Sequence, residues 1–264
     1  MRVRATARAL NLLARDPGEA LDRVRSKIEH RGDRHTPRPP AGTYEASPDS
    51  ARALHERLGA PFPCDEAAEF ARTWSEIDES LAASSSFLGA WAHDADENLG
   101  RTVWCLVRHL RPQRVVETGV ARGITTRVLL EALDRNGEGR LWSVDLPMLR
   151  TPWHDQTAAA VPDSRHPRWT YVRGSSRRRL SGLLAELGEI DVFVHDSAHT
   201  AANMRFEFER GWSALRPGGV LVSHDIQRNA AFADFAATAS AEPLYIRHGE
   251  EPGLVGILVK DPKA

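Results

Sequence analysis

Short apolar runs alternate with longer amphipathic segments along the second half of the chain. Runs rich in valine, isoleucine and leucine predict buried strands, and apolar residues at helical spacing predict helices between them. The predicted strands are residues 114–118, 141–144, 169–172, 190–195 and 219–224. The predicted helices are residues 124–135, 177–187 and 201–214. This alternation is typical of a doubly wound, mainly parallel sheet.

The last two apolar runs differ from the others because no helix separates them. Residues 243–248 and 253–259 are joined by a short segment containing glycine and proline, which predicts an antiparallel hairpin. Such a closing hairpin is unlike a nucleotide-dependent dehydrogenase. The predicted fold is therefore α/β, with a Rossmann-like seven-stranded sheet, a C-terminal antiparallel hairpin and an N-terminal helical cap.

The first part of the chain has only helical patterns. Apolar residues at helical spacing predict helices within 1–31, 49–59, 65–83 and 96–110, and residues 32–48 form a linker rich in proline, glycine and charge. We therefore expect a helical extension and cap over 1–109 and a second domain over 110–264. The helix within 1–31 is expected on the surface, where it could join copies of the chain into a homo-oligomer.

Composition narrows the function classes. With 264 residues and a net charge of −1, the chain can form one α/β domain with an appendage but lacks the basic excess of a nucleic-acid binder. Its longest N-terminal apolar run, residues 9–14, is too short for a membrane span or a secretion signal. Cys64 and Cys105 have no paired spacing, so the sequence predicts neither a disulfide framework nor a thiolate metal site. A cytoplasmic location is expected.

The most informative stretch is residues 115–126, VVETGVARGITT. Two valines end a strand, and Gly119 and Gly123 permit a sharp turn and close approach by a ligand before the next helix. Ala121 stands where the dinucleotide fingerprint has its middle glycine, which weakens a pyrophosphate interpretation. An ordinary tight turn between strand and helix is the alternative.

Two acidic residues bear on the ligand. Asp145 follows the strand 141–144, at a sheet edge where open α/β sheets bind ligands, and can accept both hydroxyl protons of a ribose. It suits the adenosine of either NAD or S-adenosylmethionine. Glu117 precedes the glycine turn, where it would repel a pyrophosphate but attract an amino group and a sulfonium. S-adenosylmethionine is therefore favoured.

Five motifs in order, VVETGVARGITT, SVDLP, RGSS, DVFVHDSAHT and LRPGGVLVSHDI, resemble class I S-adenosylmethionine-dependent methyltransferases. The resemblance covers about residues 100–260. Within the class, the motifs resemble the subgroup that includes the macrolide-sugar and catechol-type metal-dependent O-methyltransferases. The resemblance implies that Asp145 holds the ribose and that Gly174 and Ser175 lie beside the adenine. The full cofactor site that it implies consists of Glu117, Thr118, Gly119, Gly123, Thr125, Asp145, Gly174, Ser175 and Asp196.

Two polar clusters at strand ends are the expected reaction centre. Asp196 is the expected metal ligand, with a helix cap as its alternative. His199 is the expected general base, with Asp196 as the other catalytic residue that could accept the proton, and a surface histidine is the alternative for His199. His195 should point to the opposite face from Asp196, because side chains alternate along a strand. After the next strand, His224 and Asp225 would complete a metal set with Asp196.

The second cluster departs from the family. Related enzymes commonly have adjacent acids, or an acid followed by an amide, where this chain has His224 and Asp225. Histidine favours Mn²⁺ or Zn²⁺ over Mg²⁺, and the absence of any metal is the alternative. The sequence therefore predicts a methyltransferase acting on a small-molecule hydroxyl, of a secondary metabolite or sugar, with help from Mg²⁺ or Mn²⁺. A non-catalytic S-adenosylmethionine or nucleoside-binding protein and an NAD-dependent oxidoreductase are the alternatives.

One long connection bears on the acceptor. Residues 147–168 are too many for an ordinary link between elements, so they are expected to form a lid or a substrate wall. Trp153 and His154 could stack on a sugar or aromatic ring there, with a plain packing role as the alternative.

Overall fold

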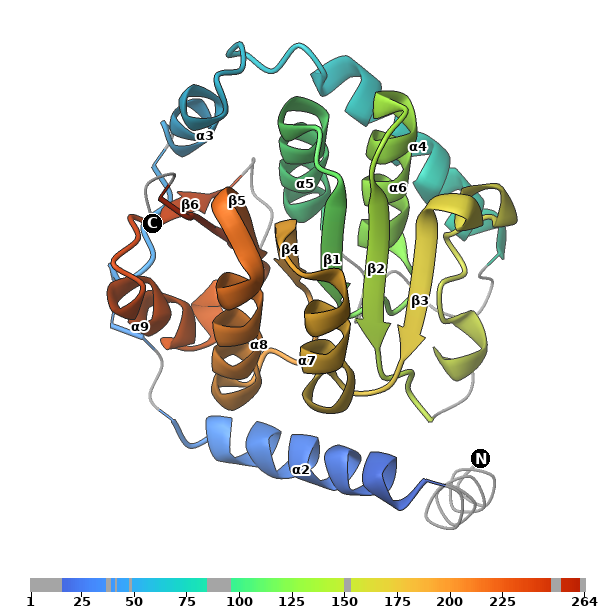
Figure 1. Ribbon diagram of the computed structural model, residues 1–264, viewed down its shortest axis with the longest axis vertical. Helices are drawn as coiled ribbons and strands as arrows, with labels where there is room; N and C mark the ends of the chain where they lie inside the picture. The colour runs from blue at the N-terminus through green and yellow to red at the C-terminus, as the bar shows by residue number, and fades with distance from the viewer. Residues whose placement is uncertain are drawn as a thin grey trace.

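The computed structural model describes residues 16–36, 39–40, 42–47, 49–84, 96–149, 153–247 and 253–261. These residues fold around a seven-stranded sheet with the strand order β3-β2-β1-β4-β5-β7-β6 (Figure 1). The strands are β1 (Arg114–Thr118), β2 (Arg140–Asp145), β3 (Trp169–Arg173), β4 (Ile190–His195), β5 (Leu215–Ser223), β6 (Leu244–Ile246) and β7 (Val255–Val259).

Five strands are parallel and the last two are not. β3, β2, β1, β4 and β5 pair in parallel, and β7 pairs antiparallel with both β5 and β6. The predicted fold class, with its closing antiparallel hairpin, is confirmed. β5 begins at Leu215 instead of residue 219 because Leu215 already pairs with Ile190 of β4, before a register irregularity.

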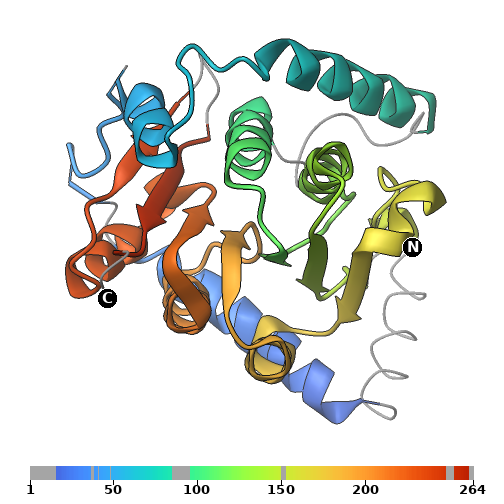
Figure 2. The ribbon, with the colours of Figure 1, turned by 45° about the horizontal axis from the view of Figure 1, so that its top comes forward.

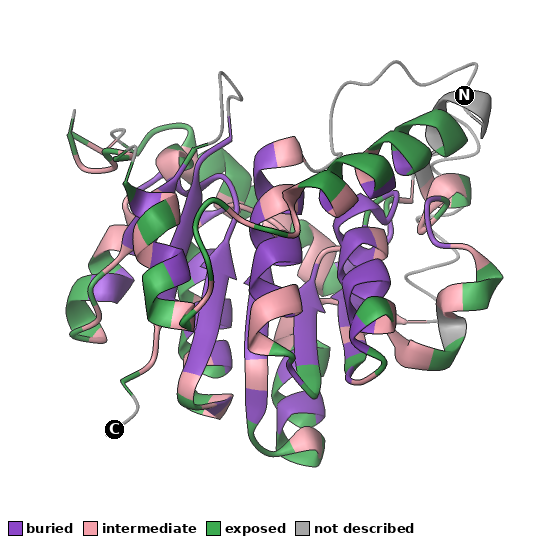
Figure 3. Ribbon diagram, turned by 90° about the horizontal axis from the view of Figure 1, so that it is seen from above, coloured by how far each residue is buried: buried purple, intermediate pink, exposed green. Residues whose placement is uncertain are grey.

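Helices cover both faces of the sheet. They are α2 (Pro17–Asp33), α3 (Ser50–Leu58), α4 (Ala67–Ser84), α5 (Glu97–Leu110), α6 (Ile124–Asn136), α7 (Ser176–Leu187), α8 (Ala201–Ala214) and α9 (Ala231–Thr238). Successive residues of β4 show the two layers. Val192 and Val194 pack with residues of α3 to α6, whereas Phe193 packs with residues of α7, α8 and α9. Most of the strand backbone is therefore buried from both sides (Figure 3).

The helix predictions agree with the structure to within a few residues, with two differences. α9 was not predicted, although its apolar Phe232, Phe235 and Ala236 are buried at helical spacing. The connection 147–168 contains two short 3₁₀ helices, η1 (Trp153–Gln156) and η2 (Asp163–Arg168). The first half of the predicted helix within 1–31 lies outside the described residues, as do parts of the linker 32–48.

α2 lies across the carboxyl ends of the strands (Figures 1 and 2). Asp16 caps the helix by accepting a hydrogen bond from the Glu19 backbone, and Pro17 suits its first turn. Glu19 is 2% exposed and pairs with Arg173 at the end of β3, and Arg23 donates to the Pro147 carbonyl after β2. α2 therefore covers the edge of the sheet where the sequence predicts the cofactor.

The outer face of α2 is apolar and open. Leu21, Val24 and Ile28 are 69%, 54% and 62% exposed. The expected association of copies through the N-terminal helices stays a prediction. In the part of the chain that the structure describes, no helix combines the length and the apolar character that crossing a bilayer requires.

Candidate functional site

The glycine turn after β1 is pressed between two neighbouring segments. Gly119 and Gly123 have φ of 89° and 88°, and a side chain on Gly119 would place its Cβ 2.1 Å from the Asp196 carbonyl oxygen. A Cβ on Gly123 would lie 3.1 Å from the Ala158 Cα, in the long connection. Ala121 takes a φ of 48°, a conformation that glycine adopts more easily. The turn therefore requires glycine for contact with β4 on one side and with residues near 158 on the other.

Glu117 lies fully buried behind this turn. Its Oε2 accepts hydrogen bonds from Thr126 (2.7 Å) and Ser143 (2.6 Å). Its Oε1 is buried and has no hydrogen-bond partner among the described residues. Burial raises the pKa of Glu117 to about 8, and the two hydrogen bonds only partly oppose this. A ligand ammonium would satisfy Oε1 and restore the charged carboxylate, so this position fits the amino end of S-adenosylmethionine.

Asp145 ends β2 beside the same turn. Its Oδ1 accepts a hydrogen bond from the Val120 backbone at 3.1 Å, and its Oδ2 accepts one from the Tyr171 hydroxyl at 3.2 Å. Burial raises the pKa of Asp145 above its usual value. Gly174 is adjacent, because its backbone N–H donates to the Asp145 carbonyl at 2.7 Å. Asp145 and Gly174 therefore lie together with the glycine turn, as the sequence predicts.

Two other predicted cofactor residues have their hydroxyls engaged elsewhere. Ser175 donates to Asp22 of α2 at 2.5 Å. Thr118 is fully buried and donates to Glu207 of α8 at 2.5 Å. Ser175 thus joins the start of α7 to α2, and Thr118 belongs to a buried network below the turn. Their roles toward a cofactor stay predictions.

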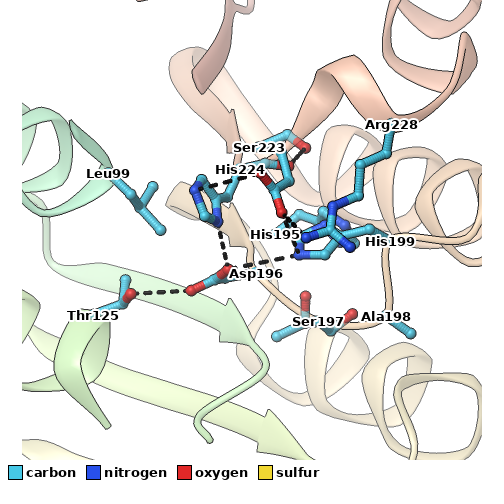
Figure 4. Close-up of polar contacts among 12 residues, drawn as sticks. Leu99, Thr125, His195, Asp196, Ser197, Ala198, His199, Ser223, His224 and Arg228 are labelled. Carbon is cyan, nitrogen blue, oxygen red and sulfur yellow. Dashed lines mark hydrogen bonds and ion pairs between the residues drawn. The ribbon is translucent and has the colours of Figure 1, made fainter. Parts of the chain in front are cut away.

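The ends of β4 and β5 form a histidine and carboxylate cluster (Figure 4). His224 lies between two acids: its Nδ1 is 3.1 Å from Asp196 Oδ1, and its Nε2 is 3.2 Å from Asp96 Oδ2. Burial alone would lower the pKa of His224, but the hydrogen bonds to Asp196 and Asp96, together with the charges of Asp196 and Asp225, raise it well above its usual value. Thr125 donates to the other Asp196 oxygen at 3.0 Å, which links the start of α6 to β4.

His199 faces the same cluster without a direct partner. Its Nε2 is 3.9 Å from Asp196 Oδ1 and 4.0 Å from Asp225 Oδ2, beyond hydrogen-bond length. Its Nδ1 is buried with no hydrogen-bond partner within the described ranges. Burial, followed by the charges of His195 and His224, holds the pKa of His199 well below its usual value. His199 is therefore a neutral imidazole whose Nε2 faces two carboxylates.

Asp225 is held apart from the predicted metal set. Arg228 pairs with its Oδ2 at 2.5 Å, and Gln227 donates to its Oδ1 at 3.1 Å. Its Oδ1 is 3.9 Å from His224 Nε2. The structure thus brings Asp196 and His224 into direct contact and leaves Asp225 in an ion pair of its own.

Two residues of this region were not predicted from the sequence. Asp96 caps α5 and also contacts His224, but a cap shows no sequence sign of its distant partner. Glu207 of α8 is fully buried and accepts hydrogen bonds from Ser197 and Asn203, with His195 Nδ1 at 2.6 Å. His195 contacts α8 while Asp196 contacts α6, so the prediction that they point to opposite faces is confirmed.

The donors at this cluster fit a divalent cation. Asp196, His199 and His224 each offer a ligand atom within 4.8 Å of the others. Adjacent ligands of an octahedral ion lie about 3.0 Å apart when the bonds are about 2.1 Å, close to the contact between Asp196 and His224. Asp96 would accept the remaining N–H of His224, the usual support for a metal-binding histidine.

The chain matches a known family over the segment that contains this site. Residues 116–226 match the methyltransferase domain family. This segment is a methyltransferase domain. The matched range runs from the glycine turn through Asp145 and Asp196 to Asp225, and Asp96 lies outside it. Dependence on S-adenosylmethionine, which the resemblance of the motifs implies, stays a prediction at this point. No curated protein matches the chain in sequence.

Solved structures agree in fold. An O-methyltransferase from Bacillus cereus in complex with S-adenosylhomocysteine is 18% identical, with a TM-score of 0.52, covering 79% of this chain and 97% of its own. TomG from Streptomyces achromogenes, an O-methyltransferase of tomaymycin synthesis bound to S-adenosylmethionine, is 14% identical, with a TM-score of 0.52 and coverage of 71% and 89%. The Podospora anserina methyltransferase PaMTH1 is 13% identical, with a TM-score of 0.52 and coverage of 76% and 98%. At these identities the likeness shows the shared fold.

Proposed function

We propose that this methyltransferase methylates a hydroxyl of a small molecule, such as a secondary metabolite or a sugar, in the cytoplasm. The observation that supports this most is His199, a neutral imidazole whose Nε2 faces Asp196 and Asp225 without a hydrogen bond. Such a nitrogen can accept a proton from a hydroxyl. The net charge of −1 also favours a small acceptor over nucleic acid.

Binding is assigned to the residues around the glycine turn. Glu117 Oε1 would accept a hydrogen bond from the amino group of the methionine end, and Asp145 would accept those of the ribose hydroxyls. Gly174 would lie beside the adenine. Bound S-adenosylmethionine supplies an electrophilic methyl group on a sulfonium. The turn contacts Asp196 directly, so the methyl group would be held next to the histidine and carboxylate cluster.

The proton is assigned to His199. As the acceptor oxygen forms its bond to the methyl carbon, the carbon–sulfur bond breaks and its electron pair stays on sulfur, leaving S-adenosylhomocysteine. The hydroxyl proton passes to His199 Nε2, and Asp196 and Asp225 stabilise the resulting imidazolium. General base catalysis of this kind contributes about 10²- to 10⁴-fold to a rate.

Metal assistance is the finer part of the proposal. Asp196 Oδ1 and His224 Nδ1 would hold the ion, and Asp96 would orient His224. The ion would lower the pKa of a coordinated hydroxyl. A histidine ligand favours Mn²⁺ over Mg²⁺. Asp225, which the sequence also places in this set, stays paired with Arg228 in the structure.

The test measures binding and turnover separately. S-adenosylmethionine binding is followed by calorimetry with and without Mn²⁺, and formation of S-adenosylhomocysteine is followed with sugars and aromatic diols as acceptors. We expect binding, turnover with a hydroxylated acceptor, and loss of turnover after EDTA that Mn²⁺ restores. Binding without turnover across all acceptors would favour the non-catalytic alternative, and turnover unchanged by EDTA would remove the metal.

A further inference from the structure

The only two cysteines of the chain meet two histidines in the second half of α5, away from the residues used above. Cys64 Sγ is 3.5 Å from Cys105 Sγ and 3.6 Å from His109 Nε2, and Cys105 Sγ is 2.9 Å from His55 Nε2. One ligand atom from each residue lies within 4.8 Å of all the others. We call these four residues the thiol cluster.

Three separate segments supply the thiol cluster. His55 comes from α3, Cys64 from the loop that follows it, and Cys105 and His109 from α5. Cys105 and His109 are four residues apart, so they lie on one face of their helix. The sequence does not show the other contacts, because Cys64 and Cys105 are 41 positions apart.

The distances approach those of a tetrahedral zinc shell. With bonds of about 2.3 Å to sulfur and 2.05 Å to nitrogen, two sulfurs lie about 3.8 Å apart, and a sulfur and a nitrogen about 3.5 Å apart. The contacts of Cys64 are within a few tenths of an ångström of these values. The pair formed by Cys105 and His55 is closer and would have to open by about 0.6 Å to admit an ion at these bond lengths.

The thiol cluster is largely buried, so a bound cation there needs ligands that neutralise its charge. His55 and Cys105 are only 3% and 6% exposed, and His55 Nδ1 is buried without a partner in the described structure, so Nε2 is the nitrogen presented to the sulfurs. Two thiolates neutralise one Zn²⁺, so the filled cluster carries no net charge into the interior. Asp65 also lies 3.6 Å from His109 Nε2, but its side chain is 63% exposed and can turn to water.

A cavity borders the thiol cluster. This cavity, of about 300 Å³, is lined by His55, Cys64 and Cys105 together with Phe62 and Arg101 and further residues. The thiol cluster is also separate from the reaction centre. Cys105 is nine residues along α5 from Asp96, which corresponds to roughly 13 Å along the helix axis.

We propose that His55, Cys64, Cys105 and His109 bind one zinc ion in a closed tetrahedral site that fastens α3 and its following loop to α5. Four protein ligands leave no position for a substrate, so the site is structural. It does not depend on the proposed methyl transfer. The competing arrangement is a disulfide between Cys64 and Cys105.

The test begins with the unaltered full chain. It is produced without a histidine tag in zinc-supplemented medium, freed of loose metal by gel filtration, and analysed for bound metal by mass spectrometry. Cobalt is then exchanged for zinc. We expect one tightly bound zinc per chain, and after exchange the visible absorption of tetrahedral Co²⁺ with a near-ultraviolet thiolate-to-cobalt band. That band reports only the thiol cluster, because the reaction centre has no sulfur ligand.

Variants assign the ligands. Cys64→Ser and His109→Ala should lose the metal and the cobalt–thiolate band, whereas His154→Ala, at an exposed loop histidine, should keep both. Asp196→Asn should also keep both, which separates this site from the reaction centre. A wild-type chain without bound zinc and without the cobalt–thiolate band would overturn the proposal, even if the variants fail to fold. So would intact-mass detection of a disulfide in the freshly purified chain.

Discussion

The two ends of α5 carry two different histidine clusters. At the start of α5, Asp96 contacts His224. In the same cluster, His199 Nε2 lies 3.9 Å from Asp196 Oδ1, which is too far for a hydrogen bond. In its last two turns, Cys105 and His109 meet their partners at 2.9 to 3.6 Å. The first cluster has room between its donors, and the second is closed by its own side chains. A site that reacts must leave a position for the reacting atom, whereas a site that fastens elements together must not.

The largest effect is expected on turnover, when the general base His199 is removed from the cluster near the start of α5. His199→Asn keeps a polar side chain of similar size but removes the basic imidazole. We expect turnover to fall by about 10²- to 10⁴-fold while S-adenosylmethionine binds as before. Turnover from S-adenosylhomocysteine formation and binding from calorimetry check this. A variant with normal turnover would assign the proton to another group.

Loss of zinc from the thiol cluster should lower the stability of the chain. Removing zinc with a strong chelator should lower the denaturant midpoint of the wild-type chain, because ligands that bind only the folded state stabilise it. Structural metal sites are often worth several kcal/mol to a folded domain. Cys64→Ser, measured alongside, should show the lower midpoint already and no further response to chelator. Equal responses of both chains would place the effect outside the thiol cluster.

Glu117, buried behind the glycine turn, should make the free energy of unfolding fall as the pH rises. Its pKa of about 8 in the folded chain exceeds the usual 4.5 of glutamate, so folding favours the protonated form. The stabilisation is complete below pH 4.5 and is lost as the pH rises toward 8, which amounts to a few kcal/mol. Urea unfolding at pH 5 and pH 8 should show this loss in the wild type relative to Glu117→Gln. A difference between the two chains that is the same at both pH values would contradict the assignment.

Asp96 belongs to the cluster at the start of α5, because it caps this helix and contacts His224. Asp96→Asn can still cap the helix but no longer presents a negative charge to His224. Loss of such a supporting carboxylate typically weakens metal binding about 10- to 100-fold. We expect a higher Mn²⁺ concentration for half-maximal turnover, with zinc content unchanged. Unchanged Mn²⁺ dependence would mean that His224 acts only as a charged partner of Asp196.

The smallest effect is expected at the glycine turn. Ala121 has a positive φ that costs roughly 1–2 kcal/mol for a residue with a side chain. Ala121→Gly removes this strain but makes the unfolded chain more flexible, which offsets about 0.4–1 kcal/mol. A small net gain in the free energy of unfolding, between about 0 and 1.6 kcal/mol, should be visible by urea titration. A clear loss would show that the methyl group of Ala121 contributes packing.

The fold was predictable because its signals are local. The strands and most helices follow from periodicity within each segment, and the hairpin of β6 and β7 from the short distance between two apolar runs. The glycine turn, Asp145 and Asp196 could be found because each directly follows a predicted strand, and His224 because it ends one. The carboxyl ends of parallel strands share one edge of the sheet.

What the sequence did not predict depends on contacts between distant segments. Asp96 meets His224 across 128 positions, and Cys64 meets Cys105 across 41, so neither pair has a spacing that stands out. The position of α2 against the end of β3 depends on ion pairs such as that between Glu19 and Arg173, which are 154 positions apart in the sequence. Glu207 was missed because a glutamate in an amphipathic helix ordinarily faces water, and here buried hydrogen bonds hold it.

A crystal structure grown with S-adenosylhomocysteine and Mn²⁺, with anomalous data at the zinc and manganese edges, tests the contrast between the two ends most directly. The account predicts zinc enclosed by His55, Cys64, Cys105 and His109, and manganese beside Asp196 and His224. S-adenosylhomocysteine should lie over the glycine turn with its sulfur toward His199. Zinc absent from the thiol cluster, or S-adenosylhomocysteine bound away from the glycine turn, would contradict it.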